Sequence, residues 1–174
     1  MPLLSASLAV LVGAFSLPML QDHSLRDLRA RALTMPPSDI GLSRKSYAHN
    51  AWAIVLDVGL DHGKGYTLLV LGDGTTSLYF STGGGIIGAG EHRSVRIASA
   101  ALLTEADGHI ATLRPATTSR LPEEGVVRFH IRTFDGNYGY EAREGPLARG
   151  DDAHAALFAK AQLVIAEIRR HSRP

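Results

Sequence analysis

The pattern of apolar and polar positions along the chain predicts five β-strands. Each candidate is a short run rich in β-branched, aromatic or leucine residues, bounded by glycine, proline, asparagine or aspartate. The runs are residues 52–58, 66–71, 75–80, 126–134 and 138–143. The first three follow one another closely and the last two stand apart. The pattern therefore predicts a three-stranded meander and a separate hairpin.

Two turns fix the direction of neighbouring strands. Asp73-Gly74 lies between the second and third runs, and an Asp-Gly pair is typical of a type I′ turn, whose two central residues both need positive φ. Asp135-Gly136-Asn137 separates the last two runs in the same way. Both pairs of strands are therefore expected to be antiparallel neighbours.

The first strand of the second pair alternates with a period of two. Between residues 127 and 132 the odd positions are apolar, and the even positions are Arg128, His130 and Arg132. We expect the polar face of this strand to lie in water, because such alternation is typical of a half-buried strand. Charged side chains on an exposed strand also hinder its pairing with a strand of another chain at the edge of a sheet.

Three helices complete the predicted order. A capping box at Ser24–Asp27 starts a short first helix, and Pro36-Pro37 ends it. Apolar positions at helical spacing predict a second helix over residues 91–113 and a third after the Asp151-Asp152 cap. The order α-βββ-α-ββ-α predicts the α+β class, with a mainly antiparallel five-stranded sheet and helices packed on it.

Residues 1–23 are an apolar N-terminal extension, and residues 24–174 are expected to form a single α+β domain. The extension lacks the basic residues that begin a secretory leader, and Gly13 and Pro18 interrupt it as a membrane span. A leader, an anchor, a buried helix and a misassigned start all stay open. We expect a cytoplasmic protein, exported only if residues 1–20 act as a leader, with no membrane contact unless they are an anchor.

Composition narrows the classes of function. The chain has 174 residues, 18 Lys and Arg against 17 Asp and Glu, and no cysteine. The lack of cysteine excludes disulfides, cysteine-bound zinc or iron–sulfur centres and a thiol nucleophile. A net charge of +1 gives no general attraction to nucleic acid. The eight histidines have no metal-binding spacing. We therefore predict no metal, no cofactor, no catalytic residue and no nucleic-acid partner.

The sequence Ser77-Leu-Tyr-Phe-Ser-Thr-Gly-Gly-Gly-Ile-Ile-Gly88, followed by Glu91-His92, resembles a group of uncharacterised small bacterial proteins. The resemblance covers about residues 24 to 170 and implies no known activity. The order of elements is similar to that of profilin-like and roadblock/longin-like domains, in topology only. This similarity implies a protein that self-associates as a homodimer or binds a protein partner.

The glycine-rich loop after the third strand is the main candidate for a binding site. Its glycines fit G-x-G-x-x-G between a strand and a helix, where free backbone N–H groups can bind phosphate. The candidate ligand-binding residues are Ser81, Thr82, Gly83, Gly84, Gly85, Gly88, His92, Arg128 and Arg132. A dinucleotide-binding site is disfavoured, because the preceding strand belongs to a hairpin and the following strand is not apolar throughout. The same glycines also suit a tight turn and a close approach of neighbouring backbone.

Two interpretations of the function follow. The first is a non-enzymatic binding or adaptor module that self-associates, with the basic face of the sheet and Ile86-Ile87 as contact surfaces. The alternative is a small-ligand-binding or catalytic domain in which the 81–92 loop holds a phosphorylated or anionic metabolite. In that case the amides of Gly83–Gly85 hold the anion, His92 is the acid or base, and an arginine of the 126–134 strand clamps the ligand.

Overall fold

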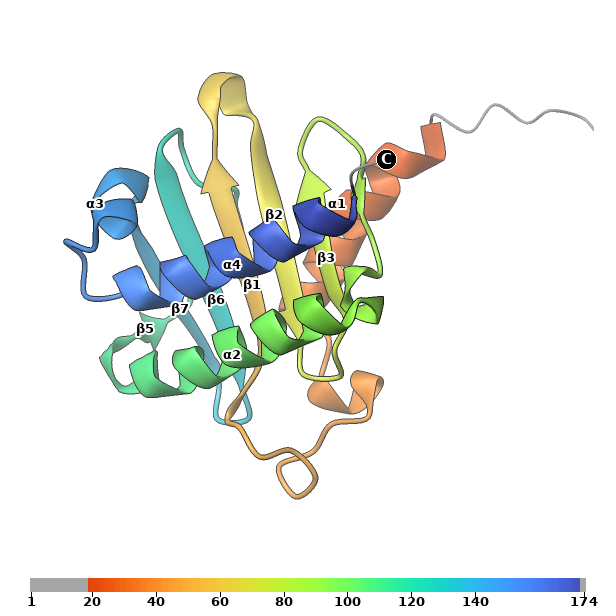
Figure 1. Ribbon diagram of the computed structural model, residues 1–174, viewed down its shortest axis with the longest axis vertical. Helices are drawn as coiled ribbons and strands as arrows, with labels where there is room; N and C mark the ends of the chain where they lie inside the picture. Colours follow the sequence, from red (N-terminus) through yellow and green to blue (C-terminus); the bar gives the residue numbers. More distant parts are fainter. Residues whose placement is uncertain (1–18, 173–174) are drawn as a thin grey trace, which may run out of the picture.

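The fold is one antiparallel sheet with helices on both of its faces (Figure 1). The computed structural model describes residues 19–172 of the chain. Two long helices, α2 (Arg93–His109) and α4 (Ala155–His171), lie side by side on one face, and α1 (Met19–Thr34) crosses the other. A short helix, α3 (Glu144–Arg149), joins the last strand to α4.

The sheet has seven strands in the spatial order β4-β3-β2-β1-β6-β7-β5, and all neighbours are antiparallel. The strands are β1 (Ala51–Gly59), β2 (Gly65–Leu71), β3 (Thr76–Phe80), β4 (Gly85–Ile86), β5 (Arg114–Pro115), β6 (Val126–Thr133) and β7 (Asn137–Arg143). The α+β class and the antiparallel sheet are confirmed. The predicted count of five strands is wrong, because β4 and β5 are additional, and the predicted order α-βββ-α-ββ-α also lacks the short helix α3. A strand of two residues shows no periodicity, so no pattern in the sequence reveals it.

The hairpin between β2 and β3 forms where it was predicted, but its turn is of another type. Gly74 N–H donates to the carbonyl of Leu71 (3.0 Å), and in this connection Gly74 alone has positive φ (93°). The carboxylate of Asp73 accepts hydrogen bonds from the backbone and side chain of Thr75. The connection is therefore a turn followed by one left-handed glycine, and not a type I′ turn.

The ends of the helices differ from the prediction at several places, and the N-cap residue of α4 is His154 and not Asp151 or Asp152. α1 begins upstream of Ser24, the predicted cap, because no proline or glycine between Met19 and Ser24 breaks a helix. It ends before Pro36-Pro37, as predicted. The second helix ends at His109 and continues as a 3-10 turn, Ile110–Thr112. Residues 1–18 of the predicted N-terminal extension lie outside the described residues.

The face of the sheet under α2 and α4 forms the main core. Ile54, Leu56 and Val58 of β1 are fully buried on this face, and Leu102 of α2 and Ile165 of α4 belong to the same apolar cluster. Burying an aliphatic side chain of this size contributes roughly 1.5–3 kcal/mol. This cluster therefore provides most of the apolar contact between the sheet and its two long helices.

The opposite face of the sheet is apolar in one half and polar in the other. α1 covers an apolar cluster that includes Trp52, Val55 and Tyr79. In the other half β6 presents its polar positions, and His130 and Arg132 are only 5% and 7% exposed. The expectation of a wet edge strand is wrong, because β6 lies in the middle of the sheet between β1 and β7. Period-two alternation shows that the two faces differ, but it does not show that one of them is in water.

Candidate functional site

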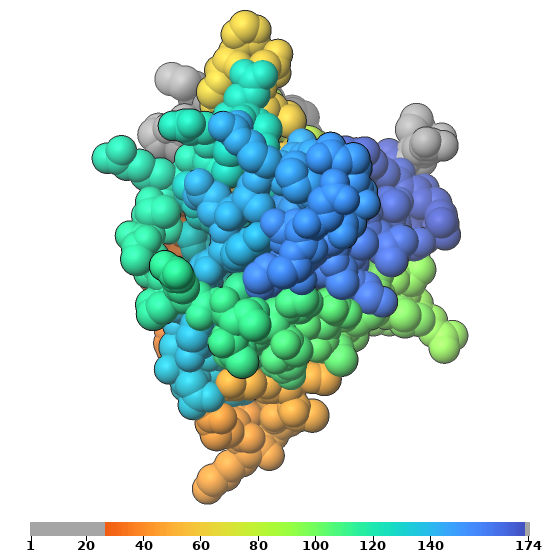
Figure 2. Space-filling model, turned by 90° about the vertical axis from the view of Figure 1, so that its left-hand side faces the viewer, coloured from red at the N-terminus to blue at the C-terminus, as the bar shows by residue number. Residues whose placement is uncertain are grey.

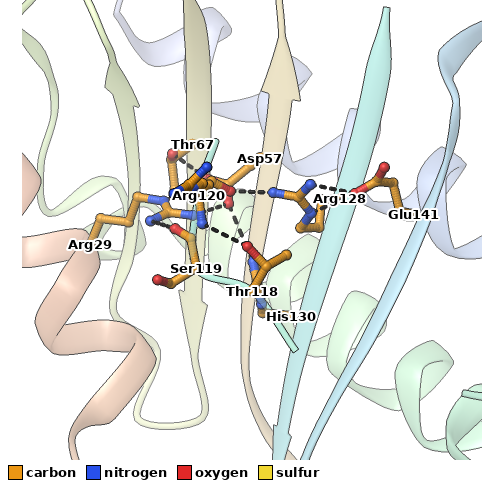
Figure 3. Close-up of polar contacts among 9 residues, drawn as sticks. All are labelled: Arg29, Asp57, Thr67, Thr118, Ser119, Arg120, Arg128, His130 and Glu141. Carbon is orange, nitrogen blue, oxygen red and sulfur yellow. Dashed lines mark hydrogen bonds and ion pairs between the residues drawn. The ribbon is translucent and has the colours of Figure 1, made fainter. Parts of the chain in front are cut away.

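A buried carboxylate is the centre of the polar half of the sheet. Asp57 on β1 is fully buried (0% exposed), and the residues next to it in this strand are apolar. The strand register places Thr67 of β2 opposite it on one side and Arg128 of β6 opposite it on the other. Arg29 reaches it from α1, and His130 approaches it from β6 (Figure 3). We call these five residues the polar cluster.

Arg29 and Asp57 form the strongest contact of the polar cluster. Arg29 Nε donates to Asp57 Oδ1 (2.9 Å) and Arg29 Nη2 donates to Oδ2 (2.5 Å), while Thr67 Oγ1 donates to Oδ1 (2.6 Å). Burial alone raises the pKa of Asp57, but the hydrogen bonds and the charge of Arg29 outweigh it, so that the pKa lies below its usual value. The carboxylate is therefore charged at neutral pH and holds the guanidinium in one orientation.

His130 is buried in the polar cluster without a full set of partners. Its Nε2 lies 3.5 Å from Asp57 Oδ2, which is an ion-pair distance but too long for a good hydrogen bond. This nitrogen is buried and makes no hydrogen bond with any described residue. The imidazole is therefore positioned by packing and by the charge of Asp57.

Residues 116–121, which we call the strap, cross the sheet over the polar cluster. They belong to the connection between β5 and β6, which lies at the surface on the side of the molecule that carries α3 (Figure 2, teal). Arg29 Nη1 donates to the carbonyl of Ser119 (2.8 Å), and Arg128 Nη1 donates to the carbonyl of Arg120. Two arginines of the polar cluster thus hold the backbone of the strap against the sheet (Figure 3).

A cavity of about 330 Å³ lies beside the strap, between α1 and the ends of β2 and β3. We call it the Arg29 cavity. Its charged and hydroxyl-bearing walls include Arg29, Lys64, Ser81 and Thr82. Its apolar walls include Phe80 and Leu121, which are 37% and 41% exposed. The volume lies at the lower end of the range of small-molecule sites.

Hydrogen-bond donors in this cavity have few protein partners. A guanidinium has five N–H donors, and the described contacts of Arg29 use three of them, so that two are left. Ser81 Oγ accepts a hydrogen bond from Gly65 N–H (2.8 Å), and its own hydroxyl proton stays available. Lys64 makes no ion pair with any described residue. Arg29, Lys64 and the hydroxyl-bearing residues Ser81 and Thr82 thus line a space whose lining includes no carboxylate side chain.

Two further hollows of about 310 and 280 Å³ lie on the other side of the strap. Both are lined by His130 and by residues 116–118. Arg128 lines the first, where it pairs with Glu141 (Arg128 Nε to Glu141 Oε2, 2.7 Å), and Arg132 lines the second. The guanidinium groups of Arg128 and Arg132 are thus engaged with protein partners.

The structure brings together some of the residues predicted for a site and separates others. Ser81 and Thr82 line the Arg29 cavity, whereas Arg128 and Arg132 lie across the strap from it. Gly83, Gly84, Gly85 and Gly88 do not line any of these three spaces. His92 precedes α2, stacks on His171 with ring centroids 4.0 Å apart and does not line any of the three spaces.

The backbone of the glycine loop is engaged in turns. Gly83 N–H donates to the carbonyl of Phe80, and Gly84 accepts a hydrogen bond from Phe80 N–H. Gly85 of β4 pairs with Tyr79 of β3. It packs so closely on β3 that a Cβ atom at Gly85 would lie 2.5 Å from the carbonyl oxygen of Leu78. Part of this loop therefore makes the tight turn and close approach that its glycines allow, as one of the two interpretations of the loop expected.

Comparison with protein-family models, with curated proteins and with solved structures finds no match to this chain. The resemblances to small bacterial proteins and to profilin-like and roadblock/longin-like domains therefore stay predictions. Within residues 19–172 no three histidine or acidic side chains are grouped as metal ligands. No helix in this part of the chain has the length and apolar character needed to span a membrane.

Among the residues that line the Arg29 cavity, sequence reasoning had named only Ser81 and Thr82. Arg29, Lys64 and Leu121 come from a helix, a turn and a long connection, and no spacing in the sequence links them. One signal was present, since Asp57 is the single charge in an otherwise apolar strand. A charge at such a position needs a buried partner, so it predicts that a basic side chain packs on that face.

Proposed function

We propose that this protein is a binding domain for a small anionic ligand that also carries an apolar group, and that the ligand occupies the Arg29 cavity. The convergence of available donors from Arg29, Lys64, Ser81 and Thr82 on a space without carboxylates supports this function. This is a form of the ligand-binding alternative expected from the sequence, with side chains in place of backbone amides.

The anionic group would be bound by the donors that the protein leaves unused. Arg29 offers two N–H groups in a fixed plane, which suits a carboxylate or phosphate. Asp57 prevents this side chain from rotating, so little conformational entropy is lost when the ligand binds. Lys64 adds a second positive charge from the β1–β2 turn.

The apolar group would lie against Phe80 and Leu121. Both side chains are partly exposed in the free protein, and covering them removes apolar surface from water. Leu121 belongs to the strap, and Ser119 of the strap already accepts a hydrogen bond from Arg29. A ligand that touches both Arg29 and Leu121 would therefore hold the strap more firmly.

Thermal unfolding with matched probes tests this function. The first probe is phenyl phosphate, which carries both the anion and an apolar ring. Inorganic phosphate carries the anion alone, and benzyl alcohol carries the ring alone. A ligand at a hundredfold excess over its Kd stabilises the folded state by about 2.7 kcal/mol. For a chain of this length each kcal/mol raises Tm by roughly 2–4 °C. We expect the largest rise in Tm with phenyl phosphate and a negligible rise with benzyl alcohol.

A pair of lysine variants assigns the effect to the cavity. Lys64→Glu places a negative charge in the wall, and we expect it to raise the Kd for phenyl phosphate by tenfold or more, about 1.4 kcal/mol. Lys45→Glu makes the same change at an exposed position outside the cavity and should leave the Kd unchanged. If no probe raises Tm, or if the two variants weaken binding equally, the cavity is not the site.

A further inference from the structure

The outer surface of α2 and α4 carries two large apolar side chains that the fold does not cover. Ile97 on α2 is 61% exposed and Leu163 on α4 is 56% exposed. They line one groove of about 350 Å³. The two helices that contribute to it, α2 and α4, lie side by side on one face of the sheet (Figure 1). Lys160 and Glu167 of α4 line the same groove.

We propose that this groove is the contact surface of a two-fold symmetric dimer, in which a second copy of the chain covers it. This proposal is independent of the ligand proposed for the Arg29 cavity, which lies on the opposite side of the sheet. It gives a location to the self-association that the sequence analysis expected from topology.

The charges on α4 are arranged so that the surface complements itself. A two-fold contact places residue i of one copy against residue j of the other, and j against i. Lys160 and Glu167 lie three residues before and four residues after Leu163, at about 4.5 and 6 Å along the helix axis. When two α4 helices cross in antiparallel orientation at Leu163, Lys160 of each copy therefore faces Glu167 of the other.

Both charged groups have unused capacity in the single chain. Lys160 makes no ion pair or hydrogen bond with a described residue. Glu167 Oε1 pairs with Arg170 (3.2 Å), but Glu167 Oε2 is buried and accepts no hydrogen bond from the described residues. A lysine from a second copy would give the Glu167 carboxylate a second basic partner and would gain a counter-charge for itself.

The shape of the groove allows two helix pairs to approach closely. Between the large side chains α2 contributes Ser94, Ala98 and Ala101, which recur at the spacing of three and four residues that follows one face of a helix. Small residues at these positions leave a groove along α2, so that the helices of the second copy can approach closely while the two Leu163 side chains meet at the symmetry axis. The four apolar side chains, Ile97 and Leu163 of each copy, would form the centre of the contact.

The mass of the full chain in solution tests this interface. Sedimentation equilibrium should give twice 18.6 kDa at high concentration, and dissociation on dilution. Leu163→Glu brings two like charges together at the symmetry axis, so we expect it to give the mass of one chain at every concentration. Ile87→Glu is the matched control, because Ile87 is 64% exposed in the glycine loop and outside the groove. It should leave the dimer intact.

A charge exchange tests the pairing itself. Lys160→Glu and Glu167→Lys each replace both attractive pairs by repulsive ones, and each should raise the dimer Kd by tenfold or more. The double variant restores opposite charges across the axis and should return the Kd to within about threefold of the original. Circular dichroism and thermal unfolding identify any variant that does not fold.

Three results would overturn the proposal. They are a chain of single mass at all concentrations, a dimer that Leu163→Glu leaves intact, and a double variant that stays as weak as the single ones. A dimer disrupted by Ile87→Glu would instead assign the contact to the glycine loop.

Discussion

The two faces of the sheet bury side chains from the same strands but stabilise the fold by different means. Under α2 and α4, β1 contributes Ile54, Leu56 and Val58 to a continuous apolar cluster. On the other face the same strand contributes Val55 and Asp57, and the second of these needs an ion pair with α1. One face therefore depends on packing, and the other depends on packing together with a few directed contacts.

This difference has a consequence for function. An apolar contact adapts to small movements, whereas a buried ion pair requires its partners to stay in place. The polar face therefore fixes the orientation of Arg29, and through it the wall of a cavity and the backbone of the strap. The predictions that follow separate the two faces, beginning with the largest expected effect.

Asp57→Ala should be the most destabilising change on the polar face. It leaves the guanidinium of Arg29 without its counter-charge, and breaking one side of a buried ion pair costs about 3–5 kcal/mol. Urea unfolding measures the loss. Asp135→Ala, which breaks the exposed pair of Arg44 and Asp135, should cost less than about 1 kcal/mol. Equal losses in the two variants would show that the polar cluster contributes no more than a surface pair.

Leu102→Ala measures the other face. Leu102 is fully buried in the cluster under α2, and such truncations cost roughly 2–5 kcal/mol, depending on how far the cavity collapses. We expect this variant to lose stability while it keeps its affinity for phenyl phosphate, since Leu102 lies across the sheet from the Arg29 cavity. A lost affinity in a folded Leu102→Ala protein would contradict the separation of the two faces.

Acid should weaken the polar face before it affects the apolar one. The pKa of Asp57 is lowered in the folded state, so between its folded and unfolded values the unfolded chain binds more protons. The stabilisation of the folded state by the Asp57 carboxylate is complete when the pH is above the unfolded pKa of about 4. It is lost as the pH falls through the lower pKa of the folded state. The urea midpoint should therefore fall with pH in this window, and less steeply in Asp57→Asn. Asp152, whose pKa is also lowered, accounts for part of the remaining slope. Identical slopes in both proteins would exclude Asp57 as a cause.

Arg132→Lys should have the smallest effect. Arg132 Nη1 donates to the carbonyls of Ala32 (2.9 Å) and Met35 (2.6 Å) at the end of α1, and the guanidinium lies over the ring of Trp52 (4.6 Å). Lysine keeps the charge but loses the planar geometry, so we expect a loss of about 1–2 kcal/mol. The fluorescence of Trp52, the single tryptophan, reports the change directly. An unchanged spectrum and midpoint would show that the charge alone is sufficient.

The parts of the fold that were predictable are those determined by local sequence. The Asp73-Gly74 and Asp135–Asn137 turns set the two hairpins, and Pro36-Pro37 set the end of α1. These features depend on a few adjacent residues, whose backbone preferences act before any tertiary contact forms.

The parts that were not predictable depend on contacts between distant residues. The alternation in β6 was correctly identified, but the burial of His130 depends on the strap and on Asp57, which lie elsewhere in the chain. The Arg29 cavity likewise combines residues 29, 64, 81 and 121. Ser81 and Thr82 were predicted because they adjoin a conspicuous glycine loop, and both line the cavity, whereas Gly83–Gly85 do not.

The two outermost strands restrict how this protein can meet copies of itself. β4 and β5 have two residues each, and β5 consists of an arginine and a proline, whose nitrogen has no hydrogen to donate. Very short edge strands are one of the ways in which a sheet discourages pairing with a strand of another chain. We therefore expect folded molecules to associate through side-chain contacts and not by backbone pairing of their edge strands.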